Sequence, residues 1–420
     1  MAESSAHNSS EPKRGSLLVI FLTVFIDLLG FGLVLPLLPI YAQDIDADNA
    51  KLAILMASFS AMQFLCAPLW GRLSDRFGRR PIIMIGLSGS VVFYTLFSIA
   101  TKERSMLLLM ISRFGAGIAG ATISTAQAYI ADTTTLEKRS KGMALIGMAF
   151  GLGFTFGPLI GYLAVPSGQG DPGPMPGYVA AGLSAFALIL AWFKLPESLT
   201  KHSETAAKNP LDLKAWGQAF AIPSIGPLLL ASFICIFSFA NFETTLSLLV
   251  GGREAVTDAK PLFHFTHGQV CLTFAFIGLT LALVQGGIVR RVAGKVSDTS
   301  LAATGSTIDI AGFAIMLVAI RQASIGFLFA GLTLVVAGFA FLTPSINALI
   351  SRRTAPENQG RVLGVGQSVS SLARIVGSGV GIPLLGIQKS LPYIAATVLM
   401  AIGLAMVLYA GRIGKDYGTE

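Results

Sequence analysis

The segment Gly71-Arg-Leu-Ser-Asp-Arg-Phe-Gly-Arg-Arg-Pro81 places five charged residues between two apolar stretches, Leu52–Trp70 and Ile82–Ala100. Each stretch can cross a bilayer as a helix, because about 20 apolar residues span its hydrocarbon core. A similar segment follows a later apolar stretch, Gly287-Ile-Val-Arg-Arg-Val-Ala-Gly-Lys295, and keeps the glycines at the first and eighth places and the base at the ninth. A charged turn that recurs between spans predicts a membrane protein with two related halves.

The composition extends this prediction to the whole chain of 420 residues. Only 12% of the residues are charged, against roughly 25% in a soluble domain, and this excludes a soluble enzyme. Long unbroken apolar runs exclude an alternating β-barrel. We therefore expect an all-α membrane protein with twelve transmembrane helices in two pseudo-symmetric six-helix bundles. The predicted spans are Leu17–Tyr41, Leu52–Trp70, Ile82–Ala100, Met106–Ile130, Met143–Val165, Tyr178–Leu195, Pro227–Val250, Gln269–Val289, Leu301–Ile320, Ser324–Leu349, Val362–Ile387 and Pro392–Tyr409.

Basic residues set the expected orientation. Of the 30 Lys and Arg residues, 21 fall in loops on the side of both termini, seven on the opposite side and two inside spans. Because Lys and Arg concentrate in cytoplasmic loops, both termini are predicted to be cytoplasmic, in the plasma (bacterial inner) membrane. The expected segments are a cytoplasmic N-tail, a first bundle, a cytoplasmic linker, a second bundle and a cytoplasmic C-tail, at residues 1–16, 17–198, 199–226, 227–410 and 411–420.

Three motifs carry a family resemblance. Gly71–Pro81 resembles the signature loop of the major facilitator superfamily. Gly153-x-x-x-Gly157-Pro158-x-x-Gly161 resembles the fifth-span motif of its twelve-span drug:proton antiporters, and Arg113-x-x-x-Gly117 resembles their fourth-span motif. The resemblance implies the major facilitator fold and a secondary transporter that exchanges its substrate for protons.

The chain is also similar to tetracycline efflux proteins. Asp27–Pro36 resembles their first span, Ala61–Pro68 their second and Gly305–Asp309 their ninth. Two positions differ: Phe93 stands where those proteins carry an acidic residue in the third span, and Leu281 where they carry a histidine in the eighth. The resemblance thus implies efflux by antiport and leaves tetracycline itself open as the substrate.

Ionisable residues inside the predicted spans are functional candidates, because each costs roughly 2.5–3.5 kcal/mol to insert. They are Asp27, Arg113, Glu243, Asp309 and Arg374. Burial in a low-dielectric cavity favours the neutral form of a carboxyl group, so Asp27 is predicted to load and release the transported proton. The alternative is a carboxylate that only holds helices together by hydrogen bonds.

Arg113 is predicted to take part in proton coupling with Asp27 or Glu243, or else to anchor the fourth span through backbone carbonyls. Glu243, close to Asn241, has the chemistry to bind a cationic substrate or a second proton, and could equally lie near the outer mouth. Gln63 completes the predicted substrate cavity with Asn241 and Glu243, since a polar side chain in a span bonds either a substrate or another helix.

Asp309 joins the proton-coupling group through the resemblance. At 1.5 Å per residue, Asp309 and Arg374 lie about 12 and 18 Å from the cytoplasmic ends of their spans. Both depths are near the middle of the bilayer, which predicts an ion pair between the two residues.

The motifs have their own expected roles. In the family, the signature loop is thought to latch the two halves in the outward-open state, and the resemblance implies this role for Gly71, Asp75, Arg76, Gly78, Arg79 and Arg80. Asp75 can pair with Arg76 or Arg79 or lie at a helix N-terminus, while the arginines also serve as cytoplasmic anchors. The small residues Gly153, Gly157 and Gly161, with Pro158, predict a kinked face for close helix packing, and the resemblance adds a seal against proton leak.

No other chemistry is expected. The chain lacks a Gly-x4-Gly-Lys-Ser/Thr loop, so a proton gradient, and not ATP or a cofactor, is the expected energy source. Its four His and three Cys residues form no metal or nucleophile–base set, so neither a metal site nor an enzyme is expected. The expected function is proton-coupled efflux of small amphiphilic compounds by a monomer without a nucleic-acid partner. The alternatives are a proton symporter or uniporter for a sugar or metabolite, and a non-transporting receptor.

Overall fold

The computed structural model describes residues 14–45, 47–134, 136–166, 172–199, 217, 220–222, 224–251, 262–354 and 359–414. Within these ranges the chain is helical, and twelve helical segments are long and apolar enough to cross a membrane. The predicted all-α fold with twelve spans is confirmed. The first half contains α1 (Arg14–Val34), α2 (Leu38–Asp44), α3 (Asn49–Phe77), α4 (Arg79–Lys102), α5 (Met106–Gly120), α6 (Ile123–Asp132), α7 (Leu136–Ala164) and α8 (Met175–Lys194). The second half contains α10 (Gly226–Gly251), α11 (His267–Leu283), η1 (Val284–Val289), α12 (Arg290–Val292), α13 (Asp298–Gln322), α14 (Ile325–Arg352), α15 (Gln359–Ile387) and α16 (Leu391–Ile413).

Three of the predicted spans are interrupted. The first ends with α1 at a turn over residues 35–37, because Pro36 lacks the backbone N–H that would continue the helix. The fourth is divided between α5 and α6 at a turn formed by Ala121 and Thr122. The eighth passes from α11 through the π-helical segment η1 into α12, and the adjacent Gly286 and Gly287 in η1 weaken a regular α-helix.

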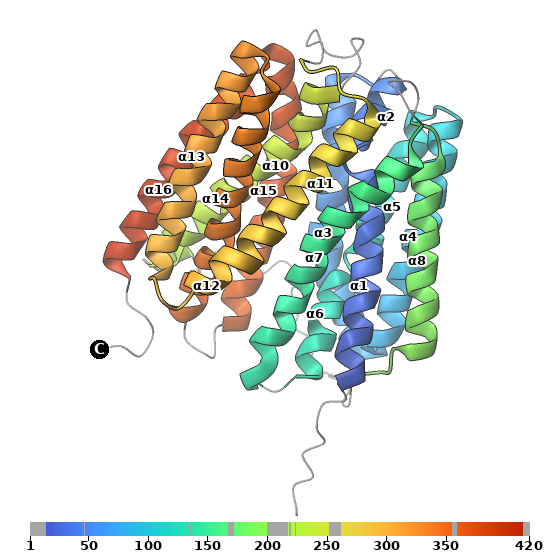
Figure 1. The fold of residues 1–420 in the computed structure, drawn as a ribbon. Helices are drawn as coiled ribbons and strands as arrows, with labels where there is room; N and C mark the ends of the chain where they lie inside the picture. Colours follow the sequence, from blue (N-terminus) through green and yellow to red (C-terminus); the bar gives the residue numbers. More distant parts are fainter. Residues whose placement is uncertain are drawn as a thin grey trace, which may run out of the picture.

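The helices pack in the same pattern in both halves (Figure 1). In the first half α1 packs against α7 and α8, and α4 packs against α5 and α8. In the second half α10 packs against α15 and α16, and α13 packs against α14 and α16. Each of these four contacts in the first half has its counterpart six spans later. The two halves are therefore pseudo-symmetric, as the recurring charged segment predicted.

The two ends of the bundle differ in the elements that they carry. Helix α1 begins and α16 ends at the lower end of the molecule in Figure 1, which we call the terminal end. The short helix α2 lies at the opposite end, which we call the α2 end. Successive spans alternate in direction between these two ends.

The halves meet mainly toward the α2 end, where α7 packs against α11 and α15 against α3. A methyl group placed on Gly161 of α7 would lie 3.3 Å from the Cys271 Sγ atom of α11, and one on Gly386 of α15 would lie 2.7 Å from the Asn49 Nδ2 atom of α3. Toward the terminal end, a methyl group on Gly147 of α7 would meet no neighbouring atom within 4 Å. The close contacts at Gly161 and Gly386 join the two halves at the α2 end, so the space between the halves is closed there.

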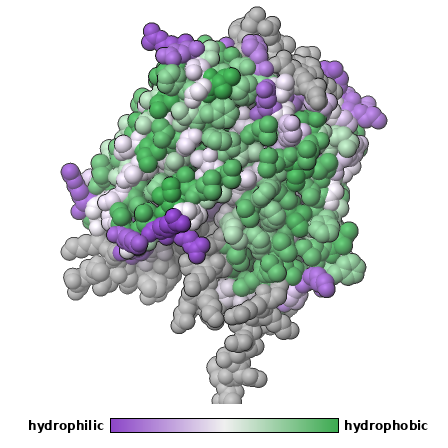
Figure 2. Space-filling view, viewed as in Figure 1, coloured by the Kyte–Doolittle hydropathy of each residue, from purple (hydrophilic) through white to green (hydrophobic). Residues whose placement is uncertain are grey.

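The surface agrees with a position in lipid. Figure 2 shows apolar side chains over the visible face of both halves, with hydrophilic residues near the two ends. Large apolar side chains are exposed on nearly every long helix, such as Leu107, Leu163, Phe193 and Ile387. A bilayer solvates such side chains, whereas water would not, so the chain is an integral multi-pass membrane protein.

Candidate functional site

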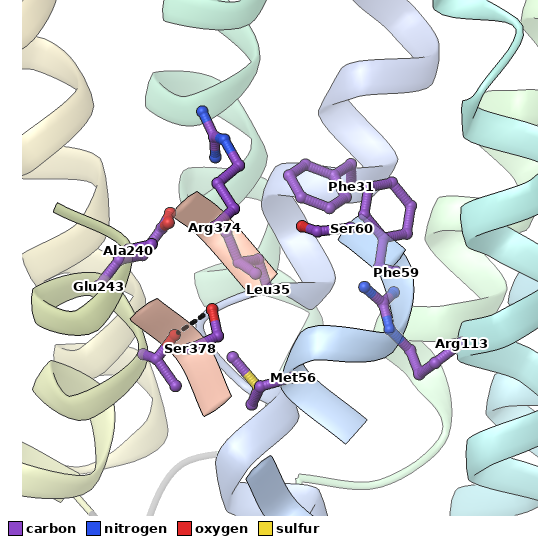
Figure 3. A pocket seen from close by; sticks show the side chains of 11 residues that line it. Phe31, Leu35, Met56, Phe59, Ser60, Arg113, Ala240, Glu243, Arg374 and Ser378 are labelled. Carbon is purple, nitrogen blue, oxygen red and sulfur yellow. Dashed lines mark hydrogen bonds between the residues drawn. The ribbon is translucent and has the colours of Figure 1, made fainter. Parts of the chain in front are cut away.

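The two halves enclose a small cavity that contains three charged side chains among apolar ones (Figure 3). Its volume is about 30 Å³, far below the roughly 300–1,000 Å³ of a site for a drug-sized ligand. Binding of such a compound therefore requires the halves to separate further. The lining residues are Phe31, Leu35, Met56, Phe59, Ser60, Arg113, Ala240, Glu243, Thr244, Arg374 and Ser378.

Arg113 enters this cavity from α5 of the first half and is only 2% exposed. The central carbon of its guanidinium group lies 5.0 Å from the centroid of the Phe59 ring. That ring in turn lies 4.7 Å from the Phe31 ring, centroid to centroid. The Arg113 Nε atom has no hydrogen-bond partner, and no ion pair of Arg113 occurs in the described part of the chain. The expected pairing with Asp27 or Glu243 is therefore not formed in this conformation.

Glu243 of α10 and Arg374 of α15 line the cavity from the second half. Figure 3 shows the two side chains on the same side of the cavity. Beside them, the Thr244 hydroxyl donates a hydrogen bond of 3.1 Å to the Ser378 Oγ atom. Glu243 thus lies at the cavity, while its predicted role in binding a substrate or a proton stays a prediction.

The predicted ion pair between Asp309 and Arg374 is not formed. Asp309 is 2% exposed and lies between α13 and α14, where a methyl group on Gly338 would come within 2.7 Å of its Cβ atom. Its Oδ1 atom has no hydrogen-bond partner among the described residues. The prediction was wrong because it used only the depth of the two residues in the membrane. Depth does not tell which face of its helix carries each residue.

Asp27 lies on α1 one helical turn before the cavity residue Phe31. Its side chain is partly buried, and the Ser184 hydroxyl of α8 donates a hydrogen bond of 2.8 Å to its Oδ1 atom. A carboxyl group in this position can keep its hydrogen bond while it gains or loses a proton at the other oxygen. Asp27 is thus held inside the first half, next to the cavity rather than within it.

Two residues predicted for the substrate cavity lie in helix contacts instead. The Gln63 side chain donates a 3.3 Å hydrogen bond from Nε2 to the carbonyl oxygen of Gly120, which joins α3 to α5. Asn241 is 1% exposed and donates a 2.9 Å hydrogen bond from Nδ2 to the carbonyl oxygen of Pro392 at the start of α16. Both side chains therefore connect helices, which was the alternative considered for such residues.

The Gly71–Pro81 segment forms the end of α3 and the start of α4, with Gly78 between them at φ +104°. Only glycine adopts this backbone conformation readily. The Arg79 guanidinium forms an ion pair with Asp75, which was one of the alternatives considered for this acid, and a second one of 2.9 Å from Nε to Asp132 Oδ2 at the end of α6. All of these partners belong to the first half, so the charges join three of its helices at the terminal end.

A further acid stabilises the start of α4. The Glu197 carboxylate, which follows α8, accepts hydrogen bonds of 2.9 and 3.1 Å from the backbone N–H groups of Arg79 and Arg80. The Arg80 guanidinium donates a 2.6 Å hydrogen bond to the carbonyl oxygen of Trp192. A carboxylate at a helix N-terminus also interacts favourably with the helix dipole. These bonds fix the loop to the end of α8.

Gly71 and Arg76 are the remaining predicted residues of the loop. A methyl group placed on Gly71, inside α3, would meet no neighbouring atom within 4 Å. The Arg76 guanidinium lies 5.2 Å from the centroid of the adjacent Phe77 ring. Neither geometry tests the latch between the halves, which stays a prediction.

The glycines of the fifth-span motif allow α7 to lie against α1. A methyl group on Gly157 would come within 2.8 Å of backbone atoms of Gly32, and one on Gly153 within 3.1 Å of the carbonyl oxygen of Leu28. Gly161 extends the contact to α11 of the other half, and Pro158 lies inside the helix. The close packing predicted for this face is present, while the seal against proton leak remains a prediction.

Sequence reasoning missed several residues of these sites. Ser184 and Asp132 gave weak signals, because a serine in a span and an acid at the end of one are both common. Glu197 was hidden because its partners are more than 100 residues away in the sequence. Phe31 and Phe59 belong to apolar spans in which most side chains face lipid or other helices, so no pattern marked them as cavity residues.

Comparisons with known proteins agree with this architecture. A family model described as Major Facilitator Superfamily matches residues 20–378. The class C tetracycline resistance protein of Escherichia coli is 29% identical, over 87% of this chain and 88% of that protein. The Homo sapiens major facilitator superfamily domain-containing protein 10 is 30% identical, over 87% of this chain and 86% of that protein. The crystal structure of the human organic anion transporter MFSD10 (TETRAN) matches with a TM-score of 0.70 and 26% identity, over 95% of this chain and 100% of that chain.

Proposed function

The chain belongs to the major facilitator superfamily, and we propose that this transporter exports small amphiphilic compounds by antiport with protons. Its relatives support organic compounds as substrates, since one is a tetracycline resistance protein and another an organic anion transporter. The apolar lining of the cavity by Phe31, Leu35, Met56 and Phe59 favours an amphiphile over a sugar. A sugar site needs many hydrogen-bonding groups, whereas rings and methylenes bind apolar bodies.

The observation that carries the antiport proposal is the position of Asp27. It is an acidic side chain within a membrane span, one helical turn from the cavity, and the Ser184 hydroxyl donates a hydrogen bond to its Oδ1 atom. Insertion of an acid into a membrane span is unfavourable, which makes such a residue a candidate for function. Asp27 is therefore the proposed proton carrier.

The conformation described fits one half of the transport cycle. With the terminal end in the cytoplasm, as the basic residues predict, the end at which the halves are packed together faces outward. Asp27 then releases its proton to the cytoplasm and the compound enters. When the halves rock, the compound leaves on the outside and Asp27 is protonated again. Each proton that crosses a potential of 100 mV supplies about 2.3 kcal/mol, so neither ATP nor a cofactor is required.

We place the transporter in a bacterial inner membrane as a monomer, with both termini in the cytoplasm. The signature loop is the proposed latch of the outward-open state, in which its charges reach the second half as well. Gly153, Gly157, Pro158 and Gly161 are the proposed seal along α7. Asp309 is a second proposed proton group, because it is a buried acid with an oxygen that lacks a partner.

Antiport is tested with purified protein in liposomes that hold a preformed pH gradient and an entrapped pH-sensitive dye. A panel of amphiphilic compounds, tetracycline included, is added on the side to which the terminal end is oriented. Antiport predicts that a transported compound accelerates the collapse of the gradient. Protein-free liposomes measure passive permeation of each compound.

Two results would contradict the proposal. A symporter would move protons in the same direction as the compound, so the pH inside would change with the opposite sign. A uniporter would transport the compound without any change in the proton flux. Binding of the compounds without flux would identify a receptor instead.

A further inference from the structure

Arg113 is a buried cation that has no partner of opposite charge in the described part of the chain. It is 2% exposed, its Nε atom makes no hydrogen bond, and it forms no ion pair within the described residues. Asp27, the acid within the first span, accepts a hydrogen bond at its Oδ1 atom from Ser184. A buried charge without a partner is strongly unfavourable. The favourable contact of Arg113 with the Phe59 ring, at 5.0 Å, offsets only part of this energy.

The opposite wall of the cavity adds a second cation. Arg374 lines it from α15, and Glu243 from α10 is the acid beside it. Arg113 and Arg374 outnumber Glu243 whether or not that carboxyl group carries a proton. The side chains that line the cavity therefore have a net positive charge in either state, and the unpartnered part of that charge lies on the Arg113 side.

The aromatic rings next to Arg113 indicate which kind of anionic compound would fit beside it. Phe59 and Phe31 lie 4.7 Å apart at the border of the cavity, and Figure 3 shows both rings beside the Arg113 guanidinium. A guanidinium group matches the two oxygens of a carboxylate, because its N–H donors form a planar fork. An acidic group on an apolar, preferably aromatic, body complements the charge and the rings together.

We propose that the compound carried by this transporter is an amphiphilic acid, whose carboxylate or similar anionic group binds Arg113 while its apolar body packs on Phe31 and Phe59. This inference rests on the proposed function, because it assigns the substrate class of the same cavity. Arg374 attracts the anion from the second half, so the bound acid brings the two halves together around it. The negative charge of the bound acid then compensates the positive charge of Arg113, which no acidic side chain among the described residues compensates.

The test uses binding to the full-length protein in lipid nanodiscs, without any gradient. The probes are 1-naphthaleneacetic acid, its amide and 2-(1-naphthyl)ethylamine, which share one ring system and differ in charge. The acid is expected to bind most tightly and the amine most weakly. Acetate and chloride serve as competitors, and neither is expected to displace the aromatic acid at millimolar concentration.

Two variants assign the preference to the cavity. Arg113→Gln is expected to weaken binding of the acid by at least about thirtyfold while binding of the amide changes little. Glu243→Gln is expected to bind the acid as tightly as the unchanged protein or more tightly. Arg321→Gln, at an exposed position of α13, is the matched control and is expected to leave all three affinities unchanged.

The inference is overturned if the amide or the amine binds as tightly as the acid, or if Arg113→Gln weakens all three probes equally, which is the result of a structural role. Displacement by acetate would reduce the site to one for small anions and would also overturn it. If Arg113→Gln does not fold, the inference is tested by the order of affinities of the three probes in the unchanged protein and in Glu243→Gln. Proton flux in liposomes is a separate measurement, so preference for acids without proton coupling contradicts only the proposed antiport.

Discussion

Asp27→Asn should abolish proton coupling while the fold persists. Asparagine keeps an Oδ1 acceptor for the Ser184 hydroxyl, which donates a 2.8 Å bond to Asp27 in the structure. The Ser184 hydroxyl would then donate its hydrogen bond to a neutral amide oxygen, and the free energy of unfolding should change by about 1 kcal/mol. The thermal midpoint of the purified protein should therefore change by only a few degrees. Compound-driven proton flux, in contrast, should fall to the level of protein-free liposomes, because an amide cannot carry a proton.

The assay follows the pH gradient in liposomes and the binding of the same compound to the same preparation. Ser184→Ala is the matched control, since it removes the hydrogen-bond donor and leaves the acid. It should lose about 1–3 kcal/mol of stability and retain coupled flux. Coupled flux that survives in Asp27→Asn would refute the role of Asp27. Equal loss of flux in both variants would show that the local packing, and not the proton, was responsible.

Three further substitutions test the structural elements around the pathway. Gly78→Ala requires alanine to adopt the backbone angle φ +104° and brings its Cβ atom within 2.5 Å of the Glu197 carboxylate. The free energy of unfolding is therefore expected to fall by about 2–4 kcal/mol in thermal denaturation. An unchanged thermal midpoint would argue against the tight turn. Asp132→Asn removes one of the two carboxylates that pair with Arg79 and should lower the free energy of unfolding by about 1–2 kcal/mol. It should also slow transport, measured as flux, more than it weakens binding of the compound. Normal transport would limit the role of this cluster to anchoring. Gly157→Val places carbon within 2.8 Å of the α1 backbone and should cost about 1–3 kcal/mol or more, visible as a lower yield of monodisperse protein.

The sequence alone determined the number of spans and the relation of the two halves. Lipid solvates only helices whose backbone is satisfied internally, so the length of each apolar run was enough to locate a span. The recurrence of the charged segments after the second and eighth spans predicted the pseudo-symmetry that the packing of α1 and α10 displays. The pairing of Asp75 with Arg79 was also accessible, because one helical turn separates the two residues.

The helix faces were decided only by the tertiary structure. In a water-soluble protein the polar face of a helix marks the outside, but in lipid both faces are apolar, and the sequence pattern no longer identifies the side that meets the pathway. Asp309 was therefore paired with Arg374 by depth, although the folded bundle turns Arg374 toward Glu243. Gln63 was assigned to the substrate cavity, whereas its side chain bonds to α5 in the structure. Height in the membrane follows from counting residues, whereas direction around each helix depends on which helices become neighbours.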